Sequence, residues 1–457
     1  METRKFVPLI VACAIIMQQV DSTAITTALP SMAKALNVSA LSLHSTITVY
    51  LLALGIFLPI SGWLADRFGA RQLFIAAIGI FTLASLLCAA TSSLTTLVIA
   101  RLIQGFGGAL MLPTARLIIV RSVPRTELVS AMLLMSMPAV IGPTIGPLIG
   151  GFIVSISSWR WIFWINLPFG ILGILLTWLF IETIPLGDRK PFDFIGFVLS
   201  GCGIGAVILG FDLFSDGRGF ASLLLAAVGM LLLVAYMLYA RNRRDPILDL
   251  TLFRYPTFRS SLLGGSLFRM GFGAIPFMLP LMMQEVFGYS PLQSGVVTFV
   301  SAIGAFGMRT ITKRILHRFG FRRVLCWNAI IASASIGLCA LFTPMTALAL
   351  MMLVILLGGV FRALQFSSIN TLAFADVESS EMSHATTLSQ MAQRLAQSMG
   401  VAGAAAMLSI FSDQSGGLTG SAFSKSFVIV AVFSALSFFS FSMIPRRAGD
   451  LLAGRAS

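Results

Sequence analysis

Long apolar stretches follow one another along almost the whole chain, separated by short polar connections. A helix that crosses a membrane needs about 20 consecutive, mainly apolar residues, and we mark fourteen segments of this kind. We predict that each one spans a membrane, so that the chain is an all-α membrane protein. The predicted spans are 6–29, 45–64, 73–91, 94–115, 128–155, 161–184, 194–213, 220–240, 260–284, 292–312, 324–343, 345–373, 383–411 and 422–444.

The composition supports this prediction. Of the 457 residues, 57% are hydrophobic and only 11% are charged, whereas an ordinary soluble domain carries roughly a quarter charged residues. A chain so poor in charge is not expected to be a cytosolic enzyme, a nucleic-acid-binding protein or a disordered protein. The five cysteines lie in apolar stretches and form no CxxC pair. We therefore expect no disulfide framework, no metal site and no cofactor.

The basic residues indicate the orientation in the membrane. Of the 31 Lys and Arg residues, 23 lie on the side of the membrane that the N-terminus shares, counting Arg309 near the end of its span, and four lie on the opposite side, counting Lys425 near the start of its span. This bias predicts that both termini are cytoplasmic. The remaining four basic residues fall inside spans: Arg101, Arg269, Arg362 and Arg394.

A cleaved signal peptide is the competing interpretation of the N-terminus. Arg4 and Lys5 precede an apolar run over residues 6–17, which is the arrangement of a secretory signal. Polar residues interrupt this run at Gln18 and Gln19. The segment that follows also carries a transporter-like motif, described below, so we favour a retained first span.

A short motif occurs twice. The sequence RFGAR at residues 67–71 returns as RFGFR at residues 318–322, with an offset of 251 residues. Both copies follow an even-numbered predicted span, which indicates two homologous halves; chance similarity of two basic loops is the alternative. We predict six helices, two inserted helices and six more helices. The corresponding parts are 1–184, the inserted helices with a linker at 185–257, 258–445, and a cytoplasmic tail at 446–457.

Four further segments carry a family resemblance: GWLADRFGAR at 62–71, RLIQGFGG at 101–108, GPTIGPLIGG at 142–151, and DST at 21–23 with ALP at 28–30. In their order along the chain, these segments resemble the motifs of the major facilitator superfamily. They resemble in particular its fourteen-helix drug/proton antiporter branch. Within this branch they resemble the motifs of the bacterial multidrug-resistance D-type exporters. The resemblance implies the major facilitator fold of two six-helix bundles plus two inserted helices. It also implies a proton-coupled antiporter that exports drug-like small molecules across the bacterial inner membrane by alternating access.

The loop at 62–71 is expected to act in gating. Gly62 and Gly69 permit close helix approach and a tight turn, while Asp66 can accept hydrogen bonds from a helix N-terminus. Arg67 and Arg71 can pair with nearby carboxylates. Such a group would latch the two halves together; the alternative is a basic loop that only obeys the positive-inside rule.

The antiporter motif is expected to form a smooth helix face. Its three glycines recur every four residues and share one face, and its two prolines remove backbone donors and bend the helix. This face suits helices that slide past each other, although static close packing is the alternative. The motif residues are Gly142, Pro143, Gly146, Pro147, Gly150 and Gly151.

Asp21 is the only carboxylate deep within a predicted span. At 1.5 Å per residue, Asp21 lies roughly 22 Å from the cytoplasmic start of its helix and Arg101 roughly 10 Å from the outer start of its own. In a hydrocarbon core about 30 Å thick these depths are similar, so the two residues could meet. Arg101 favours the ionised carboxylate, whereas burial favours the neutral acid. We predict that Asp21 carries the coupling proton and that Arg101 tunes it; a structural ion pair is the alternative.

The remaining candidates concern the cargo. Gln18, Gln19, Thr23 and Gln104 lie near this pair and either contact substrate or join helices. Arg269 and Arg394 lie near mid-membrane, where an arginine is a functional-site hypothesis by default. A positively charged cavity would favour anionic cargo, such as organic acids or their metal chelates, whereas Arg269 could equally bond backbone carbonyls.

Other classes of protein are less well supported. No ATP-binding GxxxxGK[ST] motif and no metallopeptidase or hydrolase motif occurs, so ATP-driven transport and an enzyme are not expected. A channel and a proton symporter that imports its substrate stay as alternatives. The expected partners are a small-molecule substrate, protons and membrane lipid, without nucleic acid, and we expect a monomer.

Overall fold

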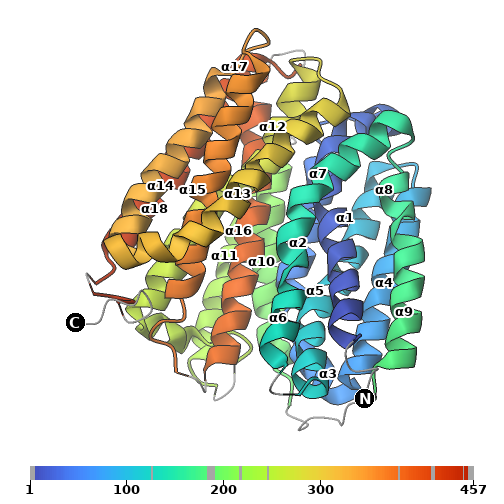
Figure 1. Ribbon diagram of the computed structural model, residues 1–457, viewed down its shortest axis with the longest axis vertical. Helices are drawn as coiled ribbons and strands as arrows, with labels where there is room; N and C mark the ends of the chain where they lie inside the picture. Colours follow the sequence, from blue (N-terminus) through green and yellow to red (C-terminus); the bar gives the residue numbers. More distant parts are fainter. Residues whose placement is uncertain are drawn as a thin grey trace. The chain divides into compact units, whose positions relative to one another are not determined.

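The computed structural model describes residues 6–124, 127–182, 191–215, 219–243, 246–378, 381–412, 417–445 and 447–450. In these segments the chain forms helices joined by short turns, with no strand (Figure 1). It divides into two compact units, Met1–Phe194 with Ser290–Gly295 and Ile195–Tyr289 with Val296–Ser457. The last two residues of the predicted first bundle, 183–184, the start of the predicted inserted part, 185–190, and most of the predicted tail lie outside the described residues.

The first unit contains the helices up to α9. Their bounds are α1 (Val7–Leu36), α2 (His44–Phe57), α3 (Ile60–Phe68), α4 (Ala70–Ala90), α5 (Leu94–Ser122), α6 (Leu128–Ser136), α7 (Pro138–Ile156), α8 (Trp161–Trp164) and α9 (Asn166–Phe180).

Two predicted spans of the first unit are broken rather than continuous. Segment 45–64 forms α2 and α3, which meet at a bend of 58°, and Pro59 stands directly before α3. Segment 128–155 breaks between α6 and α7, and Pro138 begins the second piece. Proline lacks the amide hydrogen that would continue the helix ladder, which explains both breaks. Segment 161–184 begins with the short helix α8 before α9.

The second unit includes the two predicted inserted helices, α10 and α11. Apart from the first residue of α10 and the first turn of α13, it contains all the remaining helices. Their bounds are α10 (Phe194–Ser215), α11 (Gly219–Ala240), η2 (Leu250–Arg254), α12 (Pro256–Glu285), α13 (Pro291–Phe319), α14 (Phe321–Leu338), η3 (Cys339–Leu341), α15 (Leu348–Leu372), α16 (Met382–Phe411), α17 (Gly420–Ala435) and α18 (Ser437–Ser442).

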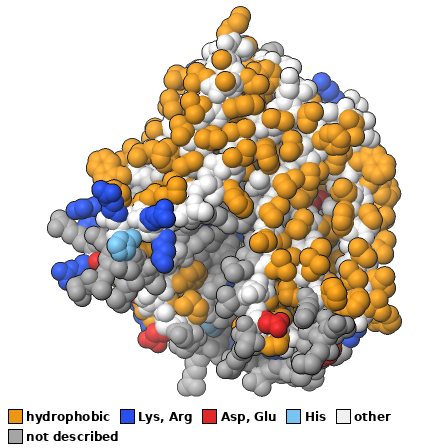
Figure 2. Space-filling model, in the orientation of Figure 1, with side chains coloured by type: hydrophobic (Ala, Val, Ile, Leu, Met, Phe, Trp, Pro, Cys, Tyr) orange, Lys and Arg blue, Asp and Glu red, His pale blue; other side chains and the backbone are white. Residues whose placement is uncertain are grey.

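The helices have the length and apolar surface of a multi-pass membrane protein. Among the described residues, 11 helices are long and apolar enough to cross a membrane, or 12 when α2 and α3 count as one bent span. Large apolar side chains face outward, such as Phe220, which is 83% exposed on α11. Figure 2 shows apolar side chains over most of the described surface in that view, with charged side chains in small groups. Such a surface suits lipid rather than water.

The repeated motif forms the same turn in both units. Gly69 separates α3 from α4 with φ of 89°, and Gly320 separates α13 from α14 with φ of 76°. Both values lie in the left-handed region, which glycine adopts without the strain of a Cβ atom. The sequence repeat at an offset of 251 residues is therefore also a structural repeat.

Candidate functional site

A buried ion pair joins α1 to α5 inside the first unit. Nη1 of Arg101 donates to Oδ2 of Asp21 at 2.6 Å, and neither side chain has exposed surface. The structure thus brings together the two residues that the sequence places at similar depths. Because both belong to the same unit, their contact depends on packing within that unit alone.

Two amide side chains complete the surroundings of the carboxylate. Nε2 of Gln104 donates to Oδ1 of Asp21 at 3.1 Å, and Nδ2 of Asn166 donates to the same oxygen at 2.7 Å. Both amides also donate to the hydroxyl of Ser85, at 2.7 and 3.2 Å. We call Asp21, Ser85, Arg101, Gln104 and Asn166 the ionic cluster; it draws on α1, α4, α5 and α9.

The guanidinium of Arg101 has further contacts. Its carbon lies 4.0 Å from the centre of the Tyr50 ring, a cation–π arrangement that stabilises a desolvated cation. Nε donates to the carbonyl of Thr46 at 3.4 Å, and Nη1 also donates to Oε1 of Gln104 at 2.6 Å. Nη2 is buried and has no hydrogen-bond acceptor among the described residues.

The two buried charges of Asp21 and Arg101 balance each other. A buried carboxylate is tolerated when a cation and hydrogen-bond donors compensate it. A proton on Asp21 removes the negative charge that balances Arg101, so the guanidinium is left buried without a counter-ion. Each partner therefore compensates the buried charge of the other.

Asn166, Ser85 and Tyr50 were not among the sequence candidates. Asn166 stands 145 residues from Asp21 along the chain and belongs to no motif. One signal could have identified it, because an amide within an apolar stretch is costly in a membrane and needs a partner there.

The polar residues of α1 mainly join helices. Nε2 of Gln18 donates to the carbonyl of Gly108 on α5 at 3.1 Å. The hydroxyl of Thr23 donates to the backbone of Gln19 at 2.9 Å and of Gly142 at 3.3 Å. For Gln18 and Thr23 these bonds favour the helix-joining role over direct contact with cargo.

The glycine face of α7 packs against α1. A Cβ at Gly142 would lie 3.3 Å from Cα of Gln19, and one at Gly146 would lie 2.9 Å from Cβ of Thr23. At Gly150 it would lie 2.8 Å from the carbonyl carbon of Ala24. The spacing of four residues therefore produces the close helix contact that the sequence predicts.

The other residues of this motif lie beside that face. Pro143 and Pro147 lie within α7, and the hydroxyl of Thr27 on α1 donates to the carbonyl of Pro147 at 3.2 Å. Gly151 packs instead against the backbone of Pro291 and Leu292. The motif therefore combines a tight contact with α1 and a hydrogen bond across it.

The residues of the predicted latch have the following partners within the first unit. Asp66 and Arg121 form an exposed ion pair of 3.5 Å. Arg67 stacks on Trp63, with 5.2 Å between the guanidinium carbon and the ring centre, and Arg71 donates to the carbonyl of Trp178 at 2.6 Å.

The role of Gly62 in close helix approach stays a prediction. A Cβ at this position would meet no described atom within 4 Å, because Gly62 lies on an exposed face of α3. Gly69 forms the tight turn through its positive φ.

Arg269 is a buried arginine of the second unit. It is 5% exposed, and Nη2 donates to Oδ1 of Asn370 at 2.7 Å. Its guanidinium carbon lies 5.1 Å from the centre of the Phe366 ring. In the described part of the chain no carboxylate pairs with it. Arg394 lies half-buried on α16.

A separate polar group joins the start of α12 to the connection between α15 and α16. Arg254 contacts both carboxylate oxygens of Glu381, at 2.9 and 3.0 Å, and the hydroxyl of Tyr255 donates to Glu381 at 2.9 Å. The hydrogen bond with Tyr255 and the charge of Glu381 raise the pKa of Arg254 above its ordinary value. This exposed pair lies outside the spans and provides a comparison for the Asp66 pair.

These features define a class of protein: a multi-pass helical membrane transporter with an internal repeat and a buried ionic cluster. Comparison with known proteins gives the family. The model of the Major Facilitator Superfamily matches residues 11–401 and, in a second match, 261–454.

Curated relatives agree with this match. The chain is 39% identical over 445 residues to the protein MdtD of Pectobacterium atrosepticum, covering 95% of both chains. It is 38% identical over 447 residues to MdtD of Escherichia coli strain K12, covering 95% of this chain and 94% of that one. The names of both relatives refer to multidrug resistance.

Solved structures share the fold. A bacterial homologue of the human lysosomal transporter Spinster, crystallised in an inward-facing, unoccupied conformation, has a TM-score of 0.71 and 18% identity, covering 100% of this chain and 99% of that one. The nucleoside transporter NupG has a TM-score of 0.59 and 14% identity, with both chains fully covered. The chain belongs to the Major Facilitator Superfamily, in the MdtD-type branch, and is a transporter rather than an enzyme.

Proposed function

We propose that the protein is a proton-coupled antiporter that exports small, drug-like molecules by alternating access. The observation that carries this proposal is the state of Asp21, a carboxylate inside a span with one cationic partner, two amide donors and almost no exposure. Such a group binds or releases a proton only together with a change in its surroundings. That property is what exchange of protons for cargo requires.

The membrane arrangement proposed here has fourteen spans. To the 12 helices or bent pairs with the length and hydropathy of a span we add two others. One is the shorter apolar helix at Ile141–Ile156, and the other is α16, whose polar residues, among them Arg394, lower its hydropathy. The spans would form two six-helix bundles, with α10 and α11 inserted between them in the chain. The distribution of basic residues supports cytoplasmic termini in a bacterial inner membrane.

The gating proposal rests on α3 and α7. The ion pair between Asp66 and Arg121 lies next to the turn at Gly69, and we propose that it breaks and forms again during the transport cycle. The glycine face of α7 would let this helix shift along α1. Both proposals concern packing within the first unit.

The cargo is proposed to be drug-like, in keeping with the names of the curated relatives. Arg269 favours a second candidate, the export of anionic metabolites such as organic acids or their metal chelates. A desolvated guanidinium with one amide partner and no described carboxylate partner attracts an anion and disfavours a cation. Uptake by proton symport is the alternative direction, and the glycine-rich motif of α7 supports export through the family resemblance.

The experiment that tests the function is a cargo screen with the purified chain in proteoliposomes. We expect a monomer to move at least one drug-like or anionic compound against its gradient when a pH gradient is imposed. Acidification of the compartment toward which cargo moves should drive that movement. Cargo movement that is insensitive to the pH gradient in every case would refute proton coupling.

A further inference from the structure

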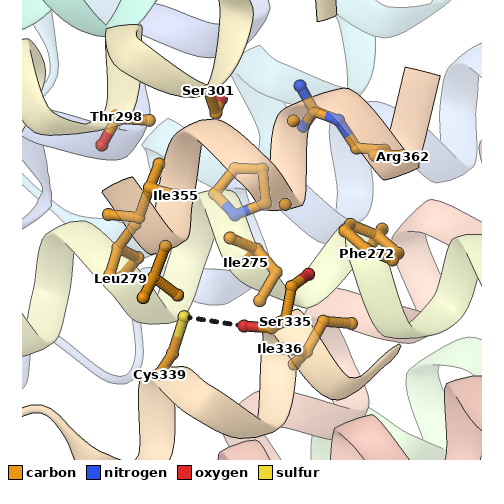
Figure 3. Close-up of a pocket in the computed structure, with 14 residues that line it drawn as sticks. Phe272, Ile275, Leu279, Thr298, Ser301, Ser335, Ile336, Cys339, Ile355 and Arg362 are labelled. Carbon is orange, nitrogen blue, oxygen red and sulfur yellow. Dashed lines mark hydrogen bonds between the residues drawn. The ribbon is translucent and has the colours of Figure 1, made fainter. Parts of the chain in front are cut away.

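The second unit contains a pocket between α12, α13, α14 and α15. Apolar side chains form much of its wall, among them Phe272, Leu279, Ile336 and Ile355. Figure 3 shows these side chains converging from different helices, with Ser301 and Arg362 at one side of the pocket. All of its lining residues belong to the second unit, so its shape depends on that unit alone.

The internal repeat relates this pocket to the ionic cluster of the first unit. The offset of 251 residues between the two turn motifs also separates Cys88 from Cys339, both of which are buried. It separates Gly108 on α5 from Gly359 on α15 as well. Cys88 lies 3.9 Å from Oε1 of Gln104 in the cluster, and Cys339 lines the pocket. The two places are therefore counterparts in the repeated halves.

The same offset shows how the chemistry differs between the counterparts. Gln104 corresponds to Ile355, which removes an amide donor, and the α12 residues that line the pocket include no carboxylate.

The offset of 251 residues also relates two more pairs of positions. Ser85 corresponds to Ile336 and Tyr50 corresponds to Ser301. In the first unit Gln104 and Ser85 belong to a hydrogen-bonded network, and Tyr50 supplies the ring that stacks on Arg101. In the second unit their counterparts all line the pocket, because the apolar replacements cannot form such a network and the ring of Tyr50 is exchanged for a small serine.

One cation stands at the pocket. Arg362 lines it from α15, and its guanidinium has no hydrogen-bond or ion-pair partner within the described segments. No Asp or Glu is among the lining residues. An apolar wall with one available guanidinium favours a ligand that has an apolar body and a negative charge at one end.

We infer that this second-unit pocket binds the apolar group of an amphipathic anion, with an aryl or branched alkyl group between Phe272 and Ile355 and a carboxylate at Arg362. This inference rests on the proposed function in one respect, namely that the ligand is cargo. It assigns different tasks to two related places: the first-unit copy binds the proton and the second-unit copy recognises the cargo.

Binding of radiolabelled benzoate to the full-length chain in nanodiscs tests the inference, with empty nanodiscs as background. We expect saturable binding, and much weaker competition by neutral benzamide and by cationic benzylamine than by unlabelled benzoate. Absence of saturable benzoate binding, or equal competition by the three compounds, would overturn the inference.

A matched pair of variants locates the site. Ile355 is buried and Leu353, two residues earlier on α15, is 52% exposed. Ile355→Phe fills the pocket and should weaken benzoate binding at least tenfold, whereas Leu353→Phe should leave it within twofold. Arg362→Gln should weaken benzoate at least fivefold, and Arg362→Lys should restore part of the loss. Equal effects of the two phenylalanine substitutions would place the ligand elsewhere.

A further variant covers the case in which Ile355→Phe does not fold. Ile355→Ala enlarges the pocket, so it should raise the affinity for 2-naphthoate relative to benzoate; an unchanged ratio would count against the pocket. Asp21→Asn separates this inference from the proposed function. It should retain benzoate binding while losing transport driven by the pH gradient, so a failure of proton coupling leaves the binding result intact.

Discussion

Asp21 and Arg101 lie 2.6 Å apart, and neither side chain has any exposed surface. The pair is isolated from water, yet one oxygen of the carboxylate also accepts hydrogen bonds from two amides. Loss of either charge therefore leaves the other one buried without compensation. The loss of one partner should therefore cost more stability than the loss of both, which is the basis of the first prediction.

Removing Arg101 alone should destabilise the protein more than removing the pair. We expect Arg101→Met to lower the free energy of unfolding by about 3–5 kcal/mol, because it leaves a buried carboxylate unpaired. The double variant Arg101→Met with Asp21→Asn should recover a large part of this loss. Unfolding titrations of the four proteins in detergent measure the coupling, and additive effects of the two substitutions would contradict a direct ion pair.

Asp21→Asn should separate proton coupling from cargo exchange. The asparagine keeps the size of the side chain but cannot release a proton. We therefore expect the variant to exchange cargo across vesicles at equal pH, while cargo no longer accumulates when a pH gradient is imposed. Continued accumulation driven by the pH gradient in this variant would exclude Asp21 as the coupling group.

Gly146→Ala should disturb the contact between α7 and α1. Its Cβ would lie 2.9 Å from Cβ of Thr23, and overpacking of this kind typically costs about 1–3 kcal/mol. Gly173→Ala is the matched control, because its Cβ would lie 3.6 Å from the nearest described atom, on Ile78. Thermal unfolding of both variants checks the prediction, which fails if the two melting temperatures agree with that of the wild type.

Adding Thr23→Ala to Gly146→Ala should restore part of the lost stability. The threonine hydroxyl is the nearest obstacle to the new methyl group, and its removal relieves that contact while the Cβ atom at position 23 remains 2.9 Å away. Thr23→Ala alone loses the hydroxyl bond to Gly142, so the comparison is made against that single variant. No recovery in the double variant would mean that the strain is absorbed elsewhere.

Asp66→Asn should impair transport without lowering stability. The side chains of Asp66 and Arg121 are 42% and 32% exposed, and an ion pair at such a surface contributes about 0–1 kcal/mol. We expect normal expression and loss of most transport, measured as initial rates in vesicles. Glu381→Gln, which breaks an exposed pair in the second unit, is the control; normal transport by Asp66→Asn would remove this residue from gating.

Arg269→Ala should discriminate between cargo charges. The buried guanidinium lies over Phe366 and has one described hydrogen-bond partner, Asn370. If it contacts cargo, anionic compounds should lose at least tenfold in transport rate while cationic compounds lose little. Parallel assays with both cargo types test this, and equal losses would assign Arg269 a structural role.

The helical class and the repeat could be predicted from the sequence because they depend on local patterns. Apolar runs long enough to span a membrane mark the helices, and the two copies of the RFG motif mark the halves. Helix breaks were predicted less well. The runs at 45–64 and 128–155 continue in hydropathy through the positions where Pro59 and Pro138 stop the helix ladder, so composition alone hides the break.

The site was predicted in part for a similar reason. Asp21 and Arg101 stand out as charges within apolar runs, and counting along two helices gives their depths. Asn166 contacts Asp21 only because α9 packs beside α1, which no local pattern encodes. For Gly62 the motif predicts close packing, and a Cβ at this position would meet no described atom within 4 Å.

The constant spacing between the buried cysteines Cys88 and Cys339 has a consequence for protein engineering. In a duplicated bundle, the residue at a position in one copy suggests a substitution for the corresponding position in the other copy. Ile355→Gln combined with Ile336→Ser would transplant the amide donor and its serine partner into the opposite bundle. A chimera of this kind would show whether the second copy can hold a hydrogen-bonded network like that of the first.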